Sequence, residues 1–250
     1  MEVNTLFSLQ NKVILVTGSS GGLGSAIVSA MQAHGAKVIA SDLNNHNKPQ
    51  SGVDFIPCDL SRNEDIDQLV ERAKALHGRI DVLVSNAGIQ GPAGPIGGAT
   101  DDDWDAVMSI NLKSALRLCS ALLPDMAERG QGSVILMSSI AGVRGNKAIG
   151  LYGLSKAGLA QLARNLAVEW GPKGIRVNCI SPGLIRTPLA TELLENAPFM
   201  ERRLSLTPLR RVGEPEEIAG VAVMLASKAG GFISGQNIVV DGGTTISDGS

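Results

Sequence analysis

The chain has 250 residues, of which 44% are apolar and 18% charged, and its net charge is −2. This composition supports a substantial core and gives no electrostatic reason to expect nucleic acid or an anionic membrane as partner. The three cysteines, Cys58, Cys119 and Cys179, are widely spaced, which indicates buried thiols in a reducing compartment rather than disulfides. There is no signal pattern, and no apolar run reaches the roughly 18 residues of a membrane span. We therefore expect a cytoplasmic protein.

Short strands alternate with helices along the chain. The strands are runs of β-branched and other apolar residues, predicted at 12–17, 37–41, 53–57, 81–85, 133–138, 175–180 and 236–240. Helices are predicted at 25–34, 61–78, 100–126 with interruptions, 150–170 and 214–226. Ser61 and Glu64 fit a capping box, and the acid-rich segment 214–217 with its early proline fits a helix start. Such alternation predicts an α/β fold with one seven-stranded parallel sheet, doubly wound with helices on both faces.

A glycine-rich turn, Thr17-Gly-Ser-Ser-Gly-Gly-Leu-Gly24, joins the first strand to the first helix. Glycine turns of this kind also occur for packing alone. However, main-chain N–H groups at a helix N-terminus favour a pyrophosphate, and glycine lets the backbone approach it closely. In its strand–turn–helix context, the turn predicts a dinucleotide site.

Residues 18–22 also match G-x-S-x-G, the nucleophile elbow of α/β-hydrolases. That fold needs a histidine after the nucleophile and the acid. The histidines are His34, His46 and His77, so none lies late enough and the hydrolase is excluded. They have no partners at metal-ligand spacing, so no metal site is expected. His34 and His77 each precede a glycine, as residues at helix C-termini do.

Asp42 follows the second predicted strand. A carboxylate there can accept both hydroxyl hydrogens of an adenosine ribose, and its charge repels a 2′-phosphate. No Arg or Lys lies in the glycine turn or directly after Asp42. The alternative is a solvated loop acid. We interpret Asp42 as a ribose ligand, and the expected cofactor is NAD.

Tyr152 and Lys156 lie four residues apart in a predicted helix, so they share a face. A phenol titrates near pH 10, and both the Lys156 ammonium and a positive nicotinamide ring would stabilise its phenolate. Tyr152 could then take the proton of a substrate hydroxyl while hydride leaves the carbinol carbon. Ser139, at the end of the fifth strand, could hydrogen-bond the same oxygen, with Ser138 as the other candidate. The alternative is a chance helical pair.

Over nearly its whole length the chain resembles the short-chain dehydrogenase/reductase family. The family's T-G-x-x-x-G-x-G is present at 17–24, its N-N-A-G at 85–88 and its P-G at 182–183. Ser85 replaces the first Asn of N-N-A-G, a residue that usually braces the sheet, so a weaker brace is expected. The resemblance implies one Rossmann-type domain over 1–250, a homotetramer, and a mobile lid at 188–213; a helical pair simply packed on the domain is the alternative for that segment.

The resemblance also assigns roles to residues. It implies a catalytic set of Asn111, Ser139, Tyr152 and Lys156, in which Asn111 holds a water beside the lysine. Asp59 would contact the adenine and Thr187 the nicotinamide amide. The full set of expected cofactor contacts is Gly18, Ser20, Gly22, Leu23, Gly24, Asp42, Asp59, Leu60, Asn86, Ala87, Gly88, Tyr152, Lys156, Pro182, Gly183, Ile185 and Thr187.

The substrate is expected beyond the carboxyl ends of the strands. The candidate contacts are Ser139, Gln90, Ile140, Arg144 and Leu189. Arg144 could meet an anionic substrate or be a solvated loop residue. The arginines at 202, 203, 210 and 211 could receive an acyl-carrier partner or be ordinary surface residues.

The main hypothesis is NAD-dependent interconversion of a small secondary alcohol, of the sugar, polyol or hydroxy-acid type, and its ketone. A 3-ketoacyl-thioester reductase is an alternative, weakened because biosynthetic reductases usually draw on NADPH. A non-catalytic NAD-sensing protein is another; it would not need Ser139, Tyr152 and Lys156 together.

Overall fold

The computed structural model describes residues 3–44 and 51–247; His46 lies outside these ranges. Seven described strands form one fully parallel sheet in the order β3-β2-β1-β4-β5-β6-β7. The strands are β1 (Val13–Thr17), β2 (Lys37–Asp42), β3 (Asp54–Pro57), β4 (Val82–Ser85), β5 (Gly132–Met137), β6 (Ile175–Pro182) and β7 (Asn237–Val240). Each lies within one or two residues of its predicted range. The doubly wound α/β fold is confirmed.

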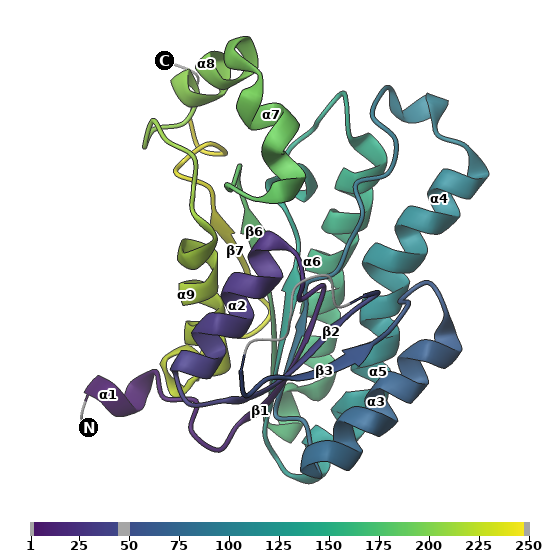
Figure 1. The fold of residues 1–250 in the computed structure, drawn as a ribbon, viewed down its shortest axis with the longest axis vertical. Helices are drawn as coiled ribbons and strands as arrows, with labels where there is room; N and C mark the ends of the chain where they lie inside the picture. Colours follow the sequence, from purple (N-terminus) through teal and green to yellow (C-terminus); the bar gives the residue numbers. More distant parts are fainter. Residues whose placement is uncertain (1–2, 45–50, 248–250) are drawn as a thin grey trace.

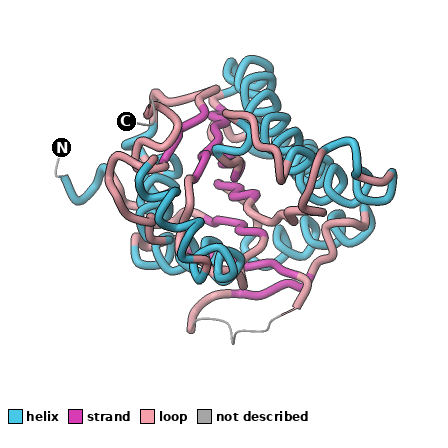
Figure 2. The backbone as a smooth tube through the Cα atoms, turned by 90° about the horizontal axis from the view of Figure 1, so that it is seen from above, coloured by secondary structure: helices cyan, strands magenta, loops and turns pink. Residues whose placement is uncertain are grey.

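Helices cover both faces of the sheet (Figures 1 and 2). One face packs against α3 (Asn63–His77), α5 (Ser114–Glu128) and α6 (Gly150–Trp170), and the other against α2 (Gly22–Ala33) and α9 (Pro215–Ala226). Buried side chains of β1 alternate between the two cores: Val13 and Leu15 face the first, Ile14 and Val16 the second. This period of two explains why the central strands read as continuous apolar runs.

The helix starts were predicted with mixed success. Glu214 caps α9 through a reciprocal capping box with Glu217, as the acid-rich start indicated. The Ser61–Glu64 box is wrong. The N-cap of α3 is Arg62, whose side chain makes no capping hydrogen bond. The Ser61 hydroxyl does not cap the helix either; it donates to the Asp59 carboxylate, 2.7 Å away.

The interrupted helix predicted at 100–126 consists of α4 (Asp101–Met108), a π-turn (Ser109–Lys113) and α5. By length and composition alone, the helical segment 101–128 would suffice to cross a membrane. The search of the sequence for a continuous apolar run did not find this candidate span. In the structure, α5 buries Leu118, Leu122 and Met126 in the core with α3 and β5. The apolar face of α5 is therefore a core face.

The segment after β6 rises above the carboxyl edge of the sheet as a 3₁₀ turn (Pro188–Ala190), α7 (Thr191–Glu195) and α8 (Ala197–Ser205). No side chain of α7 or α8 is fully buried. Short elements with so few buried contacts open at low free-energy cost. The packing suits the predicted lid.

Candidate active site

A cavity of about 490 Å³ opens at the carboxyl edge of the sheet, between the glycine turn and the α7–α8 segment. It straddles β1 and β4, where the strand order reverses, which is the expected ligand position in a doubly wound sheet. Every predicted cofactor, catalytic and substrate residue lines this cavity except Ser20 and Asn111. Segments from across the chain thus meet in one site.

The glycine turn is built for close approach. A Cβ on Gly24 would lie 2.0 Å from the Gly18 carbonyl oxygen, and one on Gly18 would lie 2.7 Å from the Ala87 Cα. A Cβ on Gly22 would lie 2.9 Å from both Thr187 and Pro188. The first two glycines let the turn fold on itself and on β4. Gly22 lets the lid segment begin directly above the turn, so the residues present fit a pyrophosphate held under that segment.

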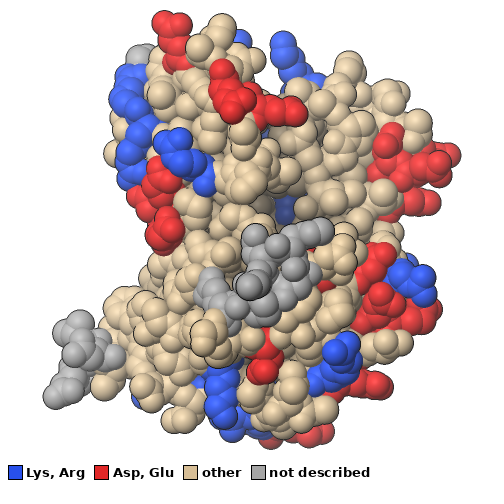
Figure 3. Space-filling view, in the orientation of Figure 1, with Lys and Arg blue, Asp and Glu red and all other residues tan. Residues whose placement is uncertain are grey.

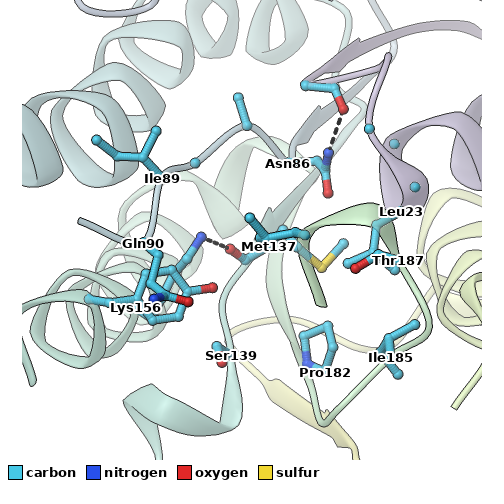
Figure 4. Close-up of a pocket in the computed structure, with 18 of the residues that line it drawn as sticks. Leu23, Asn86, Ile89, Gln90, Met137, Ser139, Lys156, Pro182, Ile185 and Thr187 are labelled. Atoms are coloured by element: carbon cyan, nitrogen blue, oxygen red, sulfur yellow. Dashed lines mark hydrogen bonds between the residues drawn. The ribbon is translucent and has the colours of Figure 1, made fainter. Parts of the chain in front are cut away.

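Asn86 fixes the glycine turn to the end of β4. Its amide donates to the Thr17 and Gly18 carbonyls at 3.2 and 2.9 Å (Figure 4). The Thr17 hydroxyl in turn accepts from the Asn86 and Ala87 main-chain N–H groups. These bonds brace the two strands across the switch point, next to the buried Ser85.

Asp42 stands at the end of β2, and its carboxylate accepts from the Ser20 and Leu43 main-chain N–H groups at 2.9 and 2.8 Å. Ser20 therefore orients the acid and does not line the cavity. A carboxylate has about four acceptor positions, so two stay available for ribose hydroxyls. No Lys or Arg among the described residues lines this end of the cavity.

Asp59 and Leu60 line the cavity beyond β3, on the same side as Asp42. The Ser61 side chain and main chain both donate to the Asp59 carboxylate, and these bonds lower its pKa. The carboxylate is thus a fixed negative acceptor, as expected for the adenosine end of the site.

Tyr152 lies in the first turn of α6, opposite Ser139 at the end of β5. Burial raises the pKa of Tyr152, and a hydrogen bond with the Ser139 side chain opposes the rise. The stabilisation of the phenolate was predicted for Lys156 and a positive nicotinamide ring acting together, and it stays a prediction. Without a positively charged ring beside it, desolvation decides the direction.

The two adjacent serines, Ser138 and Ser139, have different hydrogen-bond partners. The Ser138 hydroxyl is buried and donates to the Lys156 carbonyl at 2.7 Å, so it joins β5 to α6. The Ser139 hydroxyl accepts from the Ala141 N–H at 3.1 Å and faces Tyr152. The geometry favours Ser139 over Ser138 as the group that meets a substrate oxygen.

Lys156 is only 3% exposed, and its ammonium donates to the Met137 carbonyl at 2.7 Å (Figure 4). Burial lowers the pKa of Lys156 to about 8. Its Nζ lies 5.4 Å from the centre of the Tyr152 ring. Gly88 makes room for the lysine, since a Cβ there would lie 3.2 Å from Nζ.

Asn111 lies in the π-turn between α4 and α5. Its carbonyl oxygen accepts from the Ile89 N–H, and its amide donates to the Ile89 carbonyl and to the Ser155 hydroxyl. The predicted water beside Lys156 could bond this side chain only by donating to the second lone pair of the carbonyl oxygen. π-Turns often occur at functional sites, and this one positions Ile89 and the helix of Tyr152.

The four arginines of the predicted cluster differ in their contacts. Arg211 pairs with Glu217, and Arg210 donates to the Ser205 carbonyl. Arg203 lines the cavity, whereas Arg202 is exposed. Arg144 also lines the cavity. A role of the exposed arginines in binding an acyl carrier stays a prediction.

Several lining residues were missed by sequence reasoning. They are Ser41, Leu43, Cys58, Ile89, Ile110, Met137 and Ile149. Most are apolar neighbours of motif residues and carry no motif of their own. Met137 acts through its carbonyl, which any residue supplies, so no side-chain pattern could reveal it.

Comparison with known proteins supports the fold and the motifs. A family described as enoyl-(acyl carrier protein) reductase matches residues 18–245. Human dehydrogenase/reductase SDR family member 4 is 38% identical in an alignment of 245 positions that covers 94% of this chain and 88% of the relative. A tropinone reductase homolog of Arabidopsis thaliana is 37% identical over 250 residues, covering 96% and 81%.

Solved structures agree. A gluconate 5-dehydrogenase from Burkholderia cenocepacia, in complex with NADP and tartrate, superposes with a TM-score of 0.93 at 29% identity over 98% of this chain and all of that one. Levodione reductase gives 0.88 at 32% identity, covering 95% and 98%. The chain therefore belongs to the short-chain dehydrogenase/reductase family, oxidoreductases that use a nicotinamide cofactor.

Proposed function

We propose that the protein interconverts a small secondary alcohol and its ketone with NAD(H), Tyr152 serving as general acid and base. The observation that carries the proposal is the meeting of Ser139, Tyr152 and Lys156 at one end of a cavity whose other end suits a dinucleotide. When bound, the nicotinamide supplies or accepts the hydride.

The chain's own residues move the proton. The Ser139 hydroxyl, close to Tyr152, can hold the substrate oxygen as its charge changes. Tyr152 takes the carbinol proton in oxidation and returns it in reduction. The cation of Lys156, 5.4 Å from the ring, favours the phenolate without touching its oxygen. Asn111 holds the Ile89 main chain and Ser155, which keeps the wall beside Tyr152 in place.

NAD is the proposed cofactor because Asp42 offers free acceptor positions where an adenosine ribose would lie, while no basic described residue lines that end. The negative charge disfavours a 2′-phosphate. Since one structural relative was solved with NADP, the cofactor needs a direct test.

A polyol or hydroxy-acid substrate is the proposed class. Two similar structures are described as gluconate dehydrogenases, one of them only putatively. The decisive experiment is a panel of sugar acids, polyols and simple secondary alcohols, with the matching ketones, assayed with NAD(H) and NADP(H) in parallel. We expect turnover with NAD(H). No turnover of any carbinol or ketone with either cofactor would overturn the proposal.

Reduction of a 3-ketoacyl thioester is the second candidate; the description of the matched family, an enoyl-(acyl carrier protein) reductase, supports an acyl thioester as substrate and names no keto group. It predicts that acetoacetyl thioesters are better substrates than free oxo acids. Including one such thioester in the panel separates the two functions.

A further inference from the structure

The charged side chains that line the cavity are separated by sign. Asp42 and Asp59 stand at the adenosine end, whereas Arg144, Lys156 and Arg203 line the other end. Lysine or arginine atoms are visible at the bottom of the hollow in Figure 3. Among the described residues, no acid lines the catalytic end. That end therefore carries an uncompensated positive charge.

Arg203 is the unusual member of this group. It comes from α8, is half-buried, and its Nε is fully buried without a hydrogen-bond partner. In the described part of the chain it forms no ion pair. A buried, unpaired guanidinium group is costly unless something else satisfies it.

The surroundings of Arg203 do not supply that partner. Burial lowers the pKa of Arg203, the charge of Arg144 lowers it further, and Asp241 opposes both. The Asp241 carboxylate, however, accepts from the Gly243 and Thr245 N–H groups, forms no ion pair with Arg203 and does not line the cavity. Two like charges thus face one cavity with no carboxylate of the chain between them.

Arg144 approaches from a different element, the loop that follows Ser139 and the 3₁₀ turn Ile140–Gly142. Lys156 is less suited to the same purpose, because it is only 3% exposed and one of its three ammonium hydrogens is donated to Met137. Two guanidinium groups that converge from separate segments can bind one carboxylate by charge-assisted, bidentate hydrogen bonds. The walls nearby are apolar and include Ile149, Leu189 and Leu193.

We propose that Arg203 and Arg144 form a carboxylate subsite, so that the substrate is a hydroxy acid and the product an oxo acid. The inference deepens the proposed function, on which it rests for the reacting carbon. Arg203 would be the main specificity residue, and Arg144 would assist from the cavity edge. A carboxylate in the cavity would supply the ion-pair partner that the Arg203 guanidinium group lacks.

The test compares acids with their neutral esters. Reduction of 4-oxopentanoate and 5-oxohexanoate and of their methyl esters is measured with NADH for wild type, Arg203→Gln and Arg144→Gln. We expect Arg203→Gln to lower kcat/KM for the acids about 10- to 100-fold and to leave the esters within about threefold. Arg144→Gln should act in the same direction with a smaller effect. Arg203→Lys should restore part of the activity on acids.

Arg202→Gln and Lys147→Gln are matched controls, because both residues are exposed and neither lines the cavity. Equal losses on acids and esters in Arg203→Gln, or an unchanged ratio in both arginine variants, would overturn the subsite. If Arg203→Gln does not fold, the ratio of kcat/KM for acids to kcat/KM for esters in Arg144→Gln tests the subsite instead.

A binding measurement separates this inference from the proposed function. Succinate and inorganic phosphate are titrated into the enzyme with NADH bound, and heat is recorded. We expect succinate to bind and Arg203→Gln to weaken it at least tenfold, even if no ketone is turned over. Absence of succinate binding, or phosphate binding in its place, would contradict a carboxylate site.

Discussion

The Lys156 ammonium lies 5.4 Å from the centre of the Tyr152 ring, yet its hydrogen bond goes to the Met137 carbonyl. The lysine therefore acts on the tyrosine through its field rather than by contact. Its position is fixed by Met137, the last residue of β5, and Ser139 follows that strand two residues later. The carboxyl end of β5 thus sets the placement of Lys156 relative to Ser139.

Tyr152→Phe should abolish most turnover while leaving the cofactor site intact. General acid–base groups typically contribute about 10²- to 10⁴-fold, so a loss of that size in kcat is expected. Only the hydroxyl is removed, so NADH affinity, followed by fluorescence, should change less than about twofold. Unchanged turnover would remove Tyr152 from the mechanism.

Lys156→Met should make the protein more stable and inactive. The lowering of the Lys156 pKa from 10.5 to about 8 corresponds to a burial cost of about 3 kcal/mol for the charged form. The lost hydrogen bond to Met137 offsets about 1 kcal/mol. We expect the free energy of unfolding at pH 7 to rise by about 2 kcal/mol in urea titrations.

The same substitution has a pH signature. Between pH 8 and 10.5 the unfolded chain holds the Lys156 proton more tightly than the folded one, so wild-type stability rises with pH in that window. The advantage of Lys156→Met should therefore shrink from pH 8 upward. Lys173→Met, at an exposed lysine, should show neither effect. A constant difference from pH 7 to 10.5 would mean that the pKa of Lys156 is not lowered in the folded chain.

Ser138→Ala and Ser139→Ala should have opposite profiles. The first removes a buried hydrogen bond between β5 and α6 and should lower the free energy of unfolding by about 1–2 kcal/mol. The second removes the hydroxyl that faces Tyr152 and should lower kcat about 10²-fold with little change in stability. Thermal unfolding and initial rates on both variants check this. A large kcat loss confined to Ser138→Ala would reverse the assignment.

Much of this site could be predicted because its parts depend on backbone positions that only certain residue types can occupy. Gly18 and Gly24 are required where a Cβ would meet main chain, and strand ends bring Asp42, Asn86 and Ser139 to one edge. Both features leave a pattern in the sequence. The seven strands were predictable for the same reason, since their buried residues are apolar on both faces.

The features that could not be predicted depend on contacts that side chains make only in the folded chain. The sequence allows Ser61 to cap α3, but in the folded chain its hydroxyl donates to Asp59. The arginines near 203 are equivalent in sequence, and only the fold shows that Arg203 of α8 lines the cavity. The pKa of Tyr152 rises because desolvation by burial outweighs the hydrogen bond with Ser139. The tetramer, the cytoplasmic location and the lid motion stay predictions.

Asp42→Asn tests the cofactor preference. The substitution keeps the shape of the side chain but removes the charge. Because the Ser20 and Leu43 N–H groups donate to different carboxylate oxygens, only one of them keeps its acceptor in the variant. We expect kcat/KM for NADH to fall about tenfold, because ribose hydroxyls lose an ionised acceptor, a loss of about 1.4 kcal/mol. Activity with NADPH should stay level or rise, because repulsion of the 2′-phosphate is relieved. Steady-state rates with both cofactors measure the ratio of kcat/KM for NADH to that for NADPH.

Asp102→Asn, at an exposed acid of α4 outside the cavity, is the control and should leave this ratio unchanged. A wild-type preference for NADPH, or a ratio insensitive to Asp42→Asn, would show that the carboxylate does not face the ribose.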